Sequence, residues 1–246
     1  PLKPVEIILS NIWKDVLKIE KAGINDNFFE LGGDSIISIQ IISRANREGI
    51  KISPRQMFQH QTIAELSAVV TQKTAKAVDH NPVTGFVPNT PVQQRFFNHD
   101  LKNPSLFNHS ISFEIPAELN SDHLGNSFTL LYEHHDALRL SIDFKGNEII
   151  QFNNEVRHVS LFSIEDLKNI PENEIQKIIN ERTIFHNKSI DITKGELLRA
   201  VRFITGKNQT DLLLICIHHL CVDGISWRIL LEDLNSLINN FQNNNP

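Results

Sequence analysis

The sequence has no apolar stretch approaching the roughly 20 residues that a membrane-spanning helix needs, so we expect no membrane partner. Cysteine is scarce: Cys216 and Cys221 are the only two, and both lie in one apolar segment. Two such cysteines form no disulfide framework and are typical of a reducing compartment, which predicts a cytoplasmic protein. The opening residues, PLKPVEIILSNIW, lack the basic region and the small-residue cleavage site of a signal peptide.

Blocks of basic residues are also missing. The net charge is −5 at pH 7, which disfavours nucleic acid as a partner. The chain has 246 residues, of which 40% are hydrophobic and 22% are charged, and this is the composition of an ordinary globular protein. The length suits one large domain or two unequal ones. Because the first residue is Pro1 and not an initiator methionine, we expect a piece of a longer protein.

The first 73 residues show the apolar spacing of amphipathic helices in several places. The segments with this spacing or with helix-start signals are 4–18, 34–49, 53–60 and 61–73. They predict a small all-α four-helix bundle over residues 1–73. Residues 74–85 contain prolines and small side chains, and we interpret them as a linker.

Residues 86–246 have a different pattern. We predict a strand at 109–116, a helix at 121–139 with Ser121 as its N-cap, two strands about the KGN turn within 138–152, a helix at 171–185, a hairpin at 196–220 and a helix at 224–241. This order indicates an α/β (α+β) domain whose helices pack on a largely antiparallel sheet.

The stretch FFELGGDSIIS, residues 28–38, places two glycines, Asp34 and Ser35 in front of a helix. A serine at this position is most often a helix cap. However, two glycines leave room for another backbone or molecule to approach, and the N-terminus of a helix favours an anion such as a phosphate ester. The local pattern leaves both interpretations open.

The whole first segment resembles the peptidyl carrier domains of nonribosomal peptide synthetases, through ILSNIWKDVL, DNFFELGGDS and QTIAELSAVV. The resemblance implies that Ser35 carries covalently attached 4′-phosphopantetheine and that Asp34 belongs to the attachment site. It also implies a phosphopantetheinyl transferase and a preceding adenylation domain as partners. An aspartate before the serine is more common in carriers that serve an epimerisation domain.

A second motif, ICIHHLCVDGISWRILLEDL, occupies residues 215–234. Since successive strand side chains point to opposite faces, His218 and His219 cannot share one environment. The pair could be structural, could ligate a metal together with Asp223, or could contain a general base. Adjacent strand histidines diverge and no further His or Cys pair with helical spacing follows, so we expect no metal here.

HHLCVDG matches the HHxxxDG signature of the condensation-domain superfamily, whose fold is similar to that of chloramphenicol acetyltransferase. The continuation DGISWRILLEDL resembles epimerisation domains, and VPNTPVQQRFF and HHDALRLSIDF resemble two further motifs of the family. Two positions depart from its pattern: Arg95 stands where tryptophan is frequent, and His109 replaces the glutamine of FNQS.

The resemblance implies that His219 is the base that removes the α-proton of an aminoacyl or peptidyl thioester, and that a glutamate from a second lobe acts on the opposite face. We assign supporting roles to His218 and to Asp223, which we expect to pair with Arg139. Trp227 is expected in the core because of its large apolar area.

We therefore predict carrier-tethered L-to-D epimerisation, catalysed by an isomerase within a multidomain synthetase whose next domain is a condensation domain. The alternatives are a carrier followed by a condensation domain that forms peptide bonds, and a non-enzymatic lobe that recruits a partner. Residues 86–246 have the length of the N-terminal lobe only, so we expect the C-terminal lobe to be absent and this chain alone to be inactive.

Overall fold

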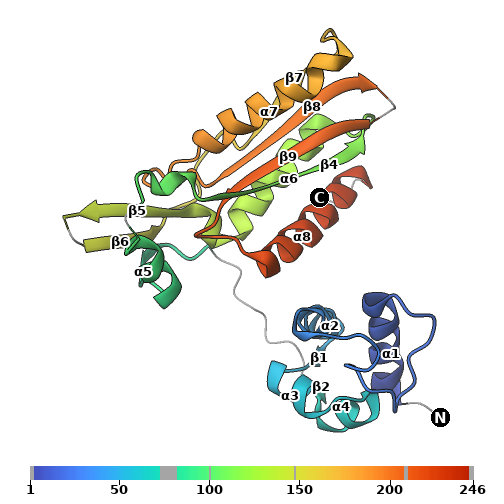
Figure 1. Ribbon diagram of the computed structural model, residues 1–246. Coiled ribbons are helices and arrows are strands. Elements are labelled where there is room, and N and C mark those ends of the chain that lie inside the picture. Colours follow the sequence, from blue (N-terminus) through green and yellow to red (C-terminus); the bar gives the residue numbers. More distant parts are fainter. Residues whose placement is uncertain (1–2, 73–81, 100, 147, 208–209, 244–246) are drawn as a thin grey trace. The chain divides into compact units, whose positions relative to one another are not determined.

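The structure is a computed structural model that describes residues 3–72, 82–99, 101–146, 148–207 and 210–243. The chain divides into two compact units, Pro1–Asp79 and His80–Pro246, which we call the N-terminal unit and the C-terminal unit (Figure 1). Each unit is described by itself. Most of the predicted linker, residues 74–81, lies outside the described residues.

Four helices make up most of the described part of the N-terminal unit. They are α1 (Pro4–Leu17), α2 (Ser35–Arg47), α3 (Pro54–Gln59) and α4 (Ile63–Val69). The predicted small helical bundle is therefore confirmed. Two short strands, β1 (Ile50–Lys51) and β2 (Thr71–Gln72), pair antiparallel and were not predicted. Two residues are too few to show the alternation by which a strand is recognised in a sequence.

The core of the N-terminal unit is built around two aromatic side chains. Trp13 of α1 and Phe28 of the long loop before α2 are both completely buried, and their ring centroids are 5.2 Å apart. Leu9, Ile41 and Leu66, from α1, α2 and α4, are also completely buried in the same cluster. The apolar faces of three helices thus meet at the loop that carries the glycine motif.

The C-terminal unit contains two sheets and several helices. The helical segments are α5 (Pro91–Phe97), η1 (Pro104–Leu106), α6 (Ser121–His134), η2 (Asp136–Arg139), α7 (Glu172–Lys188) and α8 (Gly224–Gln242). The larger sheet has the order β4 (Asn108–Pro116), β9 (Thr210–His218), β8 (Leu198–Lys207) and β7 (Phe162–Asp166). The smaller sheet has the order β3 (Gly85–Val87), β6 (Glu148–Asn153) and β5 (Leu140–Lys145).

Among the described strands of the C-terminal unit, all pairings are antiparallel except that of β7 with β8, which is parallel. The predicted α/β (α+β) lobe with a largely antiparallel sheet is confirmed. None of the helices in the described part of the chain is long and apolar enough to cross a membrane.

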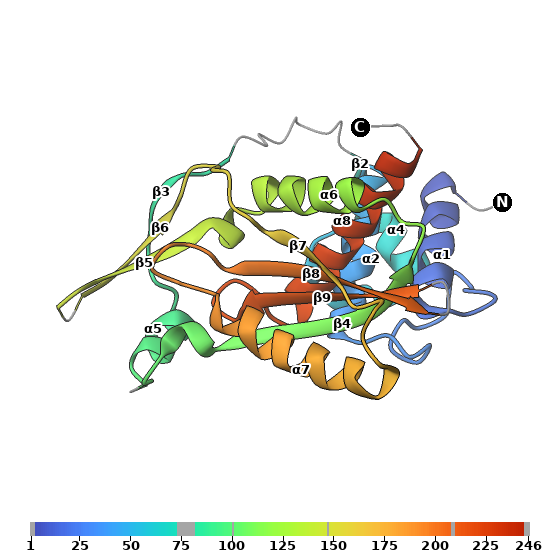
Figure 2. The same cartoon turned by 90° about the horizontal axis from the view of Figure 1, so that it is seen from above.

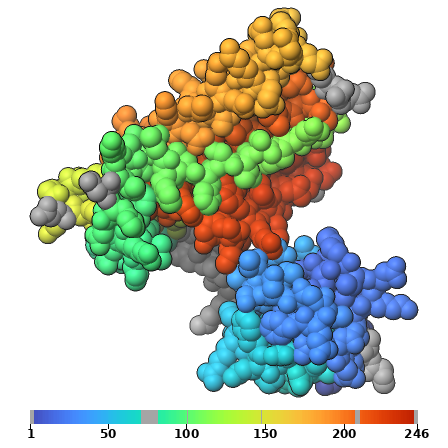
Figure 3. Space-filling view, viewed as in Figure 1, coloured from blue at the N-terminus to red at the C-terminus, as the bar shows by residue number. Residues whose placement is uncertain are grey.

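The larger sheet separates two layers of helices. Helices α6 and α8 cover one face, and α7 covers the other (Figure 2). In the space-filling view, the gold atoms of α7 lie over the orange β8 and β9 (Figure 3). The alternation of strand side chains explains both contacts: Leu213 and Ile215 of β9 pack with α6 and α8, whereas Leu214 and Cys216 pack with α7.

The predicted helix over residues 121–139 begins at the expected residue, but its N-cap and its C-terminal end were wrong. Its N-cap is Asn120 and not Ser121, because the Asn120 side chain accepts hydrogen bonds from the backbone N–H groups of Asp122 and His123. Helix α6 ends at His134, and residues 136–139 form the separate 3₁₀ helix η2. The helical spacing continues through both elements, so the sequence pattern does not show the break.

Candidate functional site

The cap of α2 is Asp34 and not Ser35. The Asp34 carboxylate accepts hydrogen bonds from the backbone N–H groups of Ile36 at 2.8 Å and Ile37 at 2.7 Å. Ser35 is the first residue of α2 and is exposed. Within the described part of the chain, we find no hydrogen bond of its hydroxyl. Capping therefore does not occupy Ser35, and its hydroxyl is accessible at the positive end of a helix dipole.

The two glycines of the motif are required for different structural reasons. Gly32 has φ +91°, a conformation that side-chain-bearing residues rarely adopt, and the space where a Cβ would lie is open. At Gly33 a Cβ would lie no more than 2.6 Å from three ring atoms of Phe28. The expectation that both glycines make room for another backbone or molecule is thus wrong for Gly33, because the Phe28 side chain of the unit's own core fills the space there.

His218 is the last residue of β9 and is completely buried. Its Nε2 lies 2.8 Å from the carbonyl oxygen of Pro104, and its Nδ1 accepts a hydrogen bond from the backbone N–H of Leu220 at 3.1 Å. Since a carbonyl only accepts, Nε2 carries the proton and the ring is neutral. Burial lowers the pKa of His218, which agrees with a neutral ring that joins the strand end to η1.

His219 faces in another direction and is half-buried. Its Nδ1 is 2.6 Å from the carbonyl oxygen of Val222, so Nδ1 donates a proton there, and in the neutral ring Nε2 is the nitrogen that carries the lone pair. The backbone N–H of His219 donates to the carbonyl oxygen of Phe107 at 2.9 Å, and the two rings are stacked with centroids 5.0 Å apart. A neutral imidazole held in this tautomer is arranged to accept a proton at Nε2.

A cleft of about 400 Å³ opens beside this ring. Its lining includes Thr90, Gln93, Phe107, His219 and Ser226. Thr90 caps α5 and Gln93 belongs to it, in the segment that resembles the opening motif of the family. The fold therefore brings that motif and the histidine motif to one cleft.

His109, whose only mark in the sequence is its departure from FNQS, lies directly against His219. The two ring centroids are 3.8 Å apart. Trp227 Nε1 donates a hydrogen bond to His109 Nδ1 at 3.4 Å. Burial, together with the nearby His219, lowers the pKa of His109 and favours its neutral form. The one signal in the sequence that could have identified His109 was its place in a predicted strand, where the family pattern has glutamine.

Asp223 caps α8, as Asp34 caps α2. Its carboxylate accepts hydrogen bonds from the backbone N–H groups of Ile225 at 3.0 Å and Ser226 at 2.7 Å, and from the Ser226 hydroxyl at 2.7 Å. The hydrogen bonds from Ser226 hold the pKa of Asp223 below its usual range. Asp223 therefore shapes the turn after His219, and it is an ionised acceptor at neutral pH.

The predicted pairing of Asp223 with Arg139 is wrong. Arg139 is completely buried and forms an ion pair with Asp136, three residues before it. Its guanidinium also donates to the carbonyl oxygens of Tyr132 and Glu133, both at 2.7 Å. Arg139 finds these partners nearby because α6 ends directly before η2, and the last carbonyl oxygens of α6 have no acceptor role within the helix.

The remaining groups near the cleft fill supporting positions. Cys221 lines the cleft, but burial raises the pKa of its thiol to about 12, so it is protonated and no nucleophile. Cys216 and Cys221 are both free. Trp227 is buried in the core between the sheet and α8, as predicted.

Comparisons with known proteins bear on both units. Residues 83–246 match the condensation domain family, and residues 8–70 match the phosphopantetheine attachment site family. The chain is 42% identical over 235 residues to a component of the linear gramicidin synthase of Brevibacillus parabrevis. This match covers 96% of the chain and 3% of that protein, so the chain spans a small part of this relative's length.

Two solved structures resemble the C-terminal unit. The epimerization domain from the third module of tyrocidine synthetase B has a TM-score of 0.63 and 31% identity, covering 68% of this chain and 37% of that chain. The starter condensation domain of rhizomide synthetase has a TM-score of 0.54 and 11% identity, covering 67% of this chain and 39% of that chain, and shows the fold alone. The chain therefore belongs to the condensation-domain family of nonribosomal peptide synthetases, with a phosphopantetheine attachment domain preceding its condensation domain.

Proposed function

We propose that this chain takes part in the L-to-D epimerisation of an aminoacyl or peptidyl thioester, within a multidomain nonribosomal peptide synthetase. The observation that carries the proposal is the state of His219, whose Nδ1–H donates to Val222 and whose Nε2 is left as a base beside a cleft. Removal of an α-proton next to a thioester carbonyl requires such a base.

Ser35 is the proposed attachment residue for 4′-phosphopantetheine. The residues present fit this group: Ser35 is exposed, its neighbour Asp34 supplies the cap, and the space beside Gly32 is open. When attached, the group supplies a thiol that holds the substrate as a thioester. Asp34 acts in the attachment site by fixing the first turn of α2, and so the position of Ser35. A phosphopantetheinyl transferase and an adenylation domain are the partners that this role requires.

His219 takes the proton from the substrate Cα onto Nε2, which leaves an enolate of the thioester, and inversion follows when an acid on the opposite face delivers a proton to Cα. His218 acts indirectly by holding the end of β9 against η1, and Asp223 by capping the helix that follows the cleft. Phe107 and His109 contact the His219 ring and keep it in one orientation.

Epimerisation is favoured over peptide-bond formation by two observations. The segment DGISWRILLEDL follows the pattern of epimerisation domains, and the likeness to an epimerization domain extends to 31% identity, against 11% for the starter condensation domain. Condensation remains the second candidate because both reactions use a histidine of the same motif.

The attachment is tested by intact-mass measurement after incubation with coenzyme A and a phosphopantetheinyl transferase. We expect the mass of one phosphopantetheinyl group on the wild-type chain and none on Ser35→Ala. The matched control is Ser43→Ala, which changes another serine of α2 and keeps the modification. Modification that persists in Ser35→Ala refutes this assignment.

The reaction is tested in the multidomain protein loaded with an aminoacyl thioester in deuterated water. We expect solvent deuterium to enter at Cα in the wild type, and His219→Gln to slow this exchange by about 10²- to 10⁴-fold. His158→Gln, at an exposed position of the same unit, is the control and retains exchange. If exchange is unchanged in His219→Gln while peptide-bond formation is lost, the unit is a condensation domain.

A further inference from the structure

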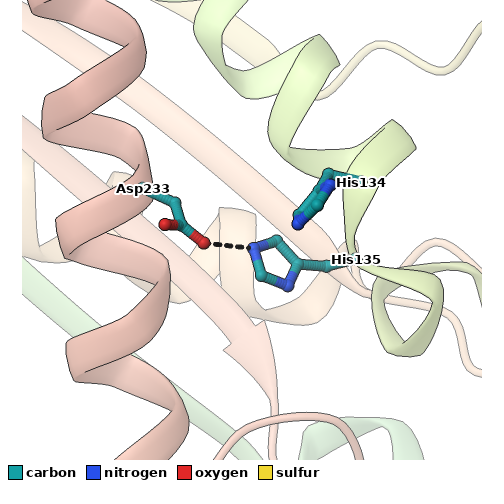
Figure 4. Close-up of side chains that lie close together, drawn as sticks. All are labelled: His134, His135 and Asp233. Carbon is teal, nitrogen blue, oxygen red and sulfur yellow. Dashed lines mark hydrogen bonds and ion pairs between the residues drawn. The ribbon is translucent and has the colours of Figure 1, made fainter. Parts of the chain in front are cut away.

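A second group of histidines lies away from the cleft, between the end of α6 and the middle of α8. His134 is the last residue of α6, His135 follows it, and Asp233 projects from α8 (Figure 4). His135 Nε2 and Asp233 Oδ2 are 3.1 Å apart. One ligand atom from each of the three residues lies within 4.8 Å of the others.

We propose that His134, His135 and Asp233 bind a divalent first-row transition-metal ion, with Zn²⁺ as the best fit. Two imidazole nitrogens and one carboxylate oxygen are a donor set that suits zinc, whereas Mg²⁺ and Ca²⁺ prefer oxygen ligands throughout. Three protein ligands leave a fourth position for water.

The geometry needs a small adjustment at one residue. In a tetrahedral zinc site with bonds of about 2.0 Å, neighbouring ligand atoms are about 3.3 Å apart. The contact between His135 and Asp233 already has this spacing, at 3.1 Å. The ligand atoms of the three residues all lie within 4.8 Å of one another, so the gap to a spacing of about 3.3 Å is at most about 1.5 Å, and a rotation of the exposed His134 side chain closes it. In the structure His135 Nε2 donates to the Asp233 carboxylate; on binding, the metal takes the place of this proton, which leaves Nε2.

The surroundings favour a cation and leave it accessible. Both histidines lie at the C-terminal end of α6, the negative end of the helix dipole. A hollow of about 490 Å³ adjoins them, and its lining includes Glu133, His134, Asp233 and Ser236. The nearby positive charge of Arg139 is already paired with Asp136, and its donors occupy the carbonyl oxygens of Tyr132 and Glu133. The three side chains are therefore the proposed ligands, and the carbonyl oxygens of Tyr132 and Glu133 already accept hydrogen bonds from Arg139.

The site is distinct from the cleft of His219. Asp233 follows Asp223 by ten residues along α8, which corresponds to about 15 Å of helix. A metal ion here would join α6 to α8, the two helices that cover one face of the larger sheet. The proposal does not rest on the proposed function, because it concerns other residues and another cavity.

The test is calorimetric titration of the purified 246-residue chain with Zn²⁺, together with the visible absorption spectrum of the Co²⁺-substituted chain. We expect one ion per chain and a spectrum typical of a four-coordinate site with nitrogen and oxygen ligands. Loss of a ligand should weaken binding by about tenfold or more, since loss of residues that only orient ligands costs about 10- to 100-fold. His134→Ala and Asp233→Asn are the test variants.

His158→Ala is the matched control, an exposed histidine outside the group that should keep the affinity. His134→Ala removes an exposed side chain, so it keeps the fold even if Asp233→Asn weakens the contact between the helices. The proposal is overturned if the wild-type chain shows no saturable binding, or if both variants bind Zn²⁺ as tightly as the wild type. In either case the contact between His135 and Asp233 is only a link between two helices.

Discussion

The two glycines before Ser35 allow one prediction to be worked out in detail, for Gly33→Ala. The new methyl group would lie no more than 2.6 Å from three atoms of the Phe28 ring. The ring cannot move away freely, because Phe28 is completely buried and packs against Trp13 and Phe29 at centroid distances of 5.2 and 5.0 Å. The φ of Gly33 lies outside the left-handed region, so the cost is steric and not backbone strain.

Overpacking of this kind costs about 1–3 kcal/mol, and expelling the ring altogether would cost about 3–5 kcal/mol, as for loss of a buried phenylalanine. A shift of the ring is the cheaper response, so we expect a loss of about 2 kcal/mol from the free energy of unfolding of the N-terminal unit. This raises the population of its opened form by about 30-fold.

The assay is native-state hydrogen exchange of the α1 and α2 amides in the whole chain, which reports on this unit alone. A second mutation, Phe28→Leu, tests whether the cost of Gly33→Ala arises from the clash with the Phe28 ring. With Gly33→Ala, the two effects should be non-additive by about 0.5–3 kcal/mol, because the residues touch. With Gly32→Ala, whose new methyl group meets nothing within 4 Å, they should add within about 0.5 kcal/mol. Additive effects for Gly33→Ala and Phe28→Leu would refute the reasoning.

Three further predictions concern the C-terminal unit. Asp223→Ala removes the cap of α8 and should cost about 0.5–2 kcal/mol in urea unfolding; an unchanged midpoint would contradict the capping role. Burial lowers the pKa of His218 and His109, so the unfolded chain binds protons more readily, and the free energy of unfolding should fall as pH drops below about 6.5. A flat profile between about pH 7 and 5 argues against this. His109→Leu leaves Trp227 Nε1 without an acceptor and should destabilise by about 1–3 kcal/mol, more than His109→Gln in thermal unfolding. Equal losses in the two variants would show that this hydrogen bond contributes nothing.

Much of both sites was predictable because the information is local. Ser35 stands beside its capping residue and its glycines, and His219 stands beside the turn that holds its ring. Helical spacing and strand alternation likewise depend on near neighbours, so most elements were predicted with small errors at their ends. The break between α6 and η2 escaped prediction because both continue one apolar pattern.

The partners that were missed or wrongly assigned are set by packing. His109 is 118 residues from Trp227 in the chain, and only the register of β4 against β9 brings it to the histidine motif. Arg139 binds the end of α6 and not Asp223, because the fold places free carbonyl oxygens beside its buried guanidinium.

The amino-acid sequence alone therefore determined which segments form helices and strands, and which serine and histidines are candidates for chemistry, since these follow from residue types and short spacings. The tertiary structure decided what surrounds them: the ring beneath Gly33, the imidazole against His219, and the carboxylate that meets His135. Such contacts join distant segments, and they exist only once the strands are paired and the helices are packed.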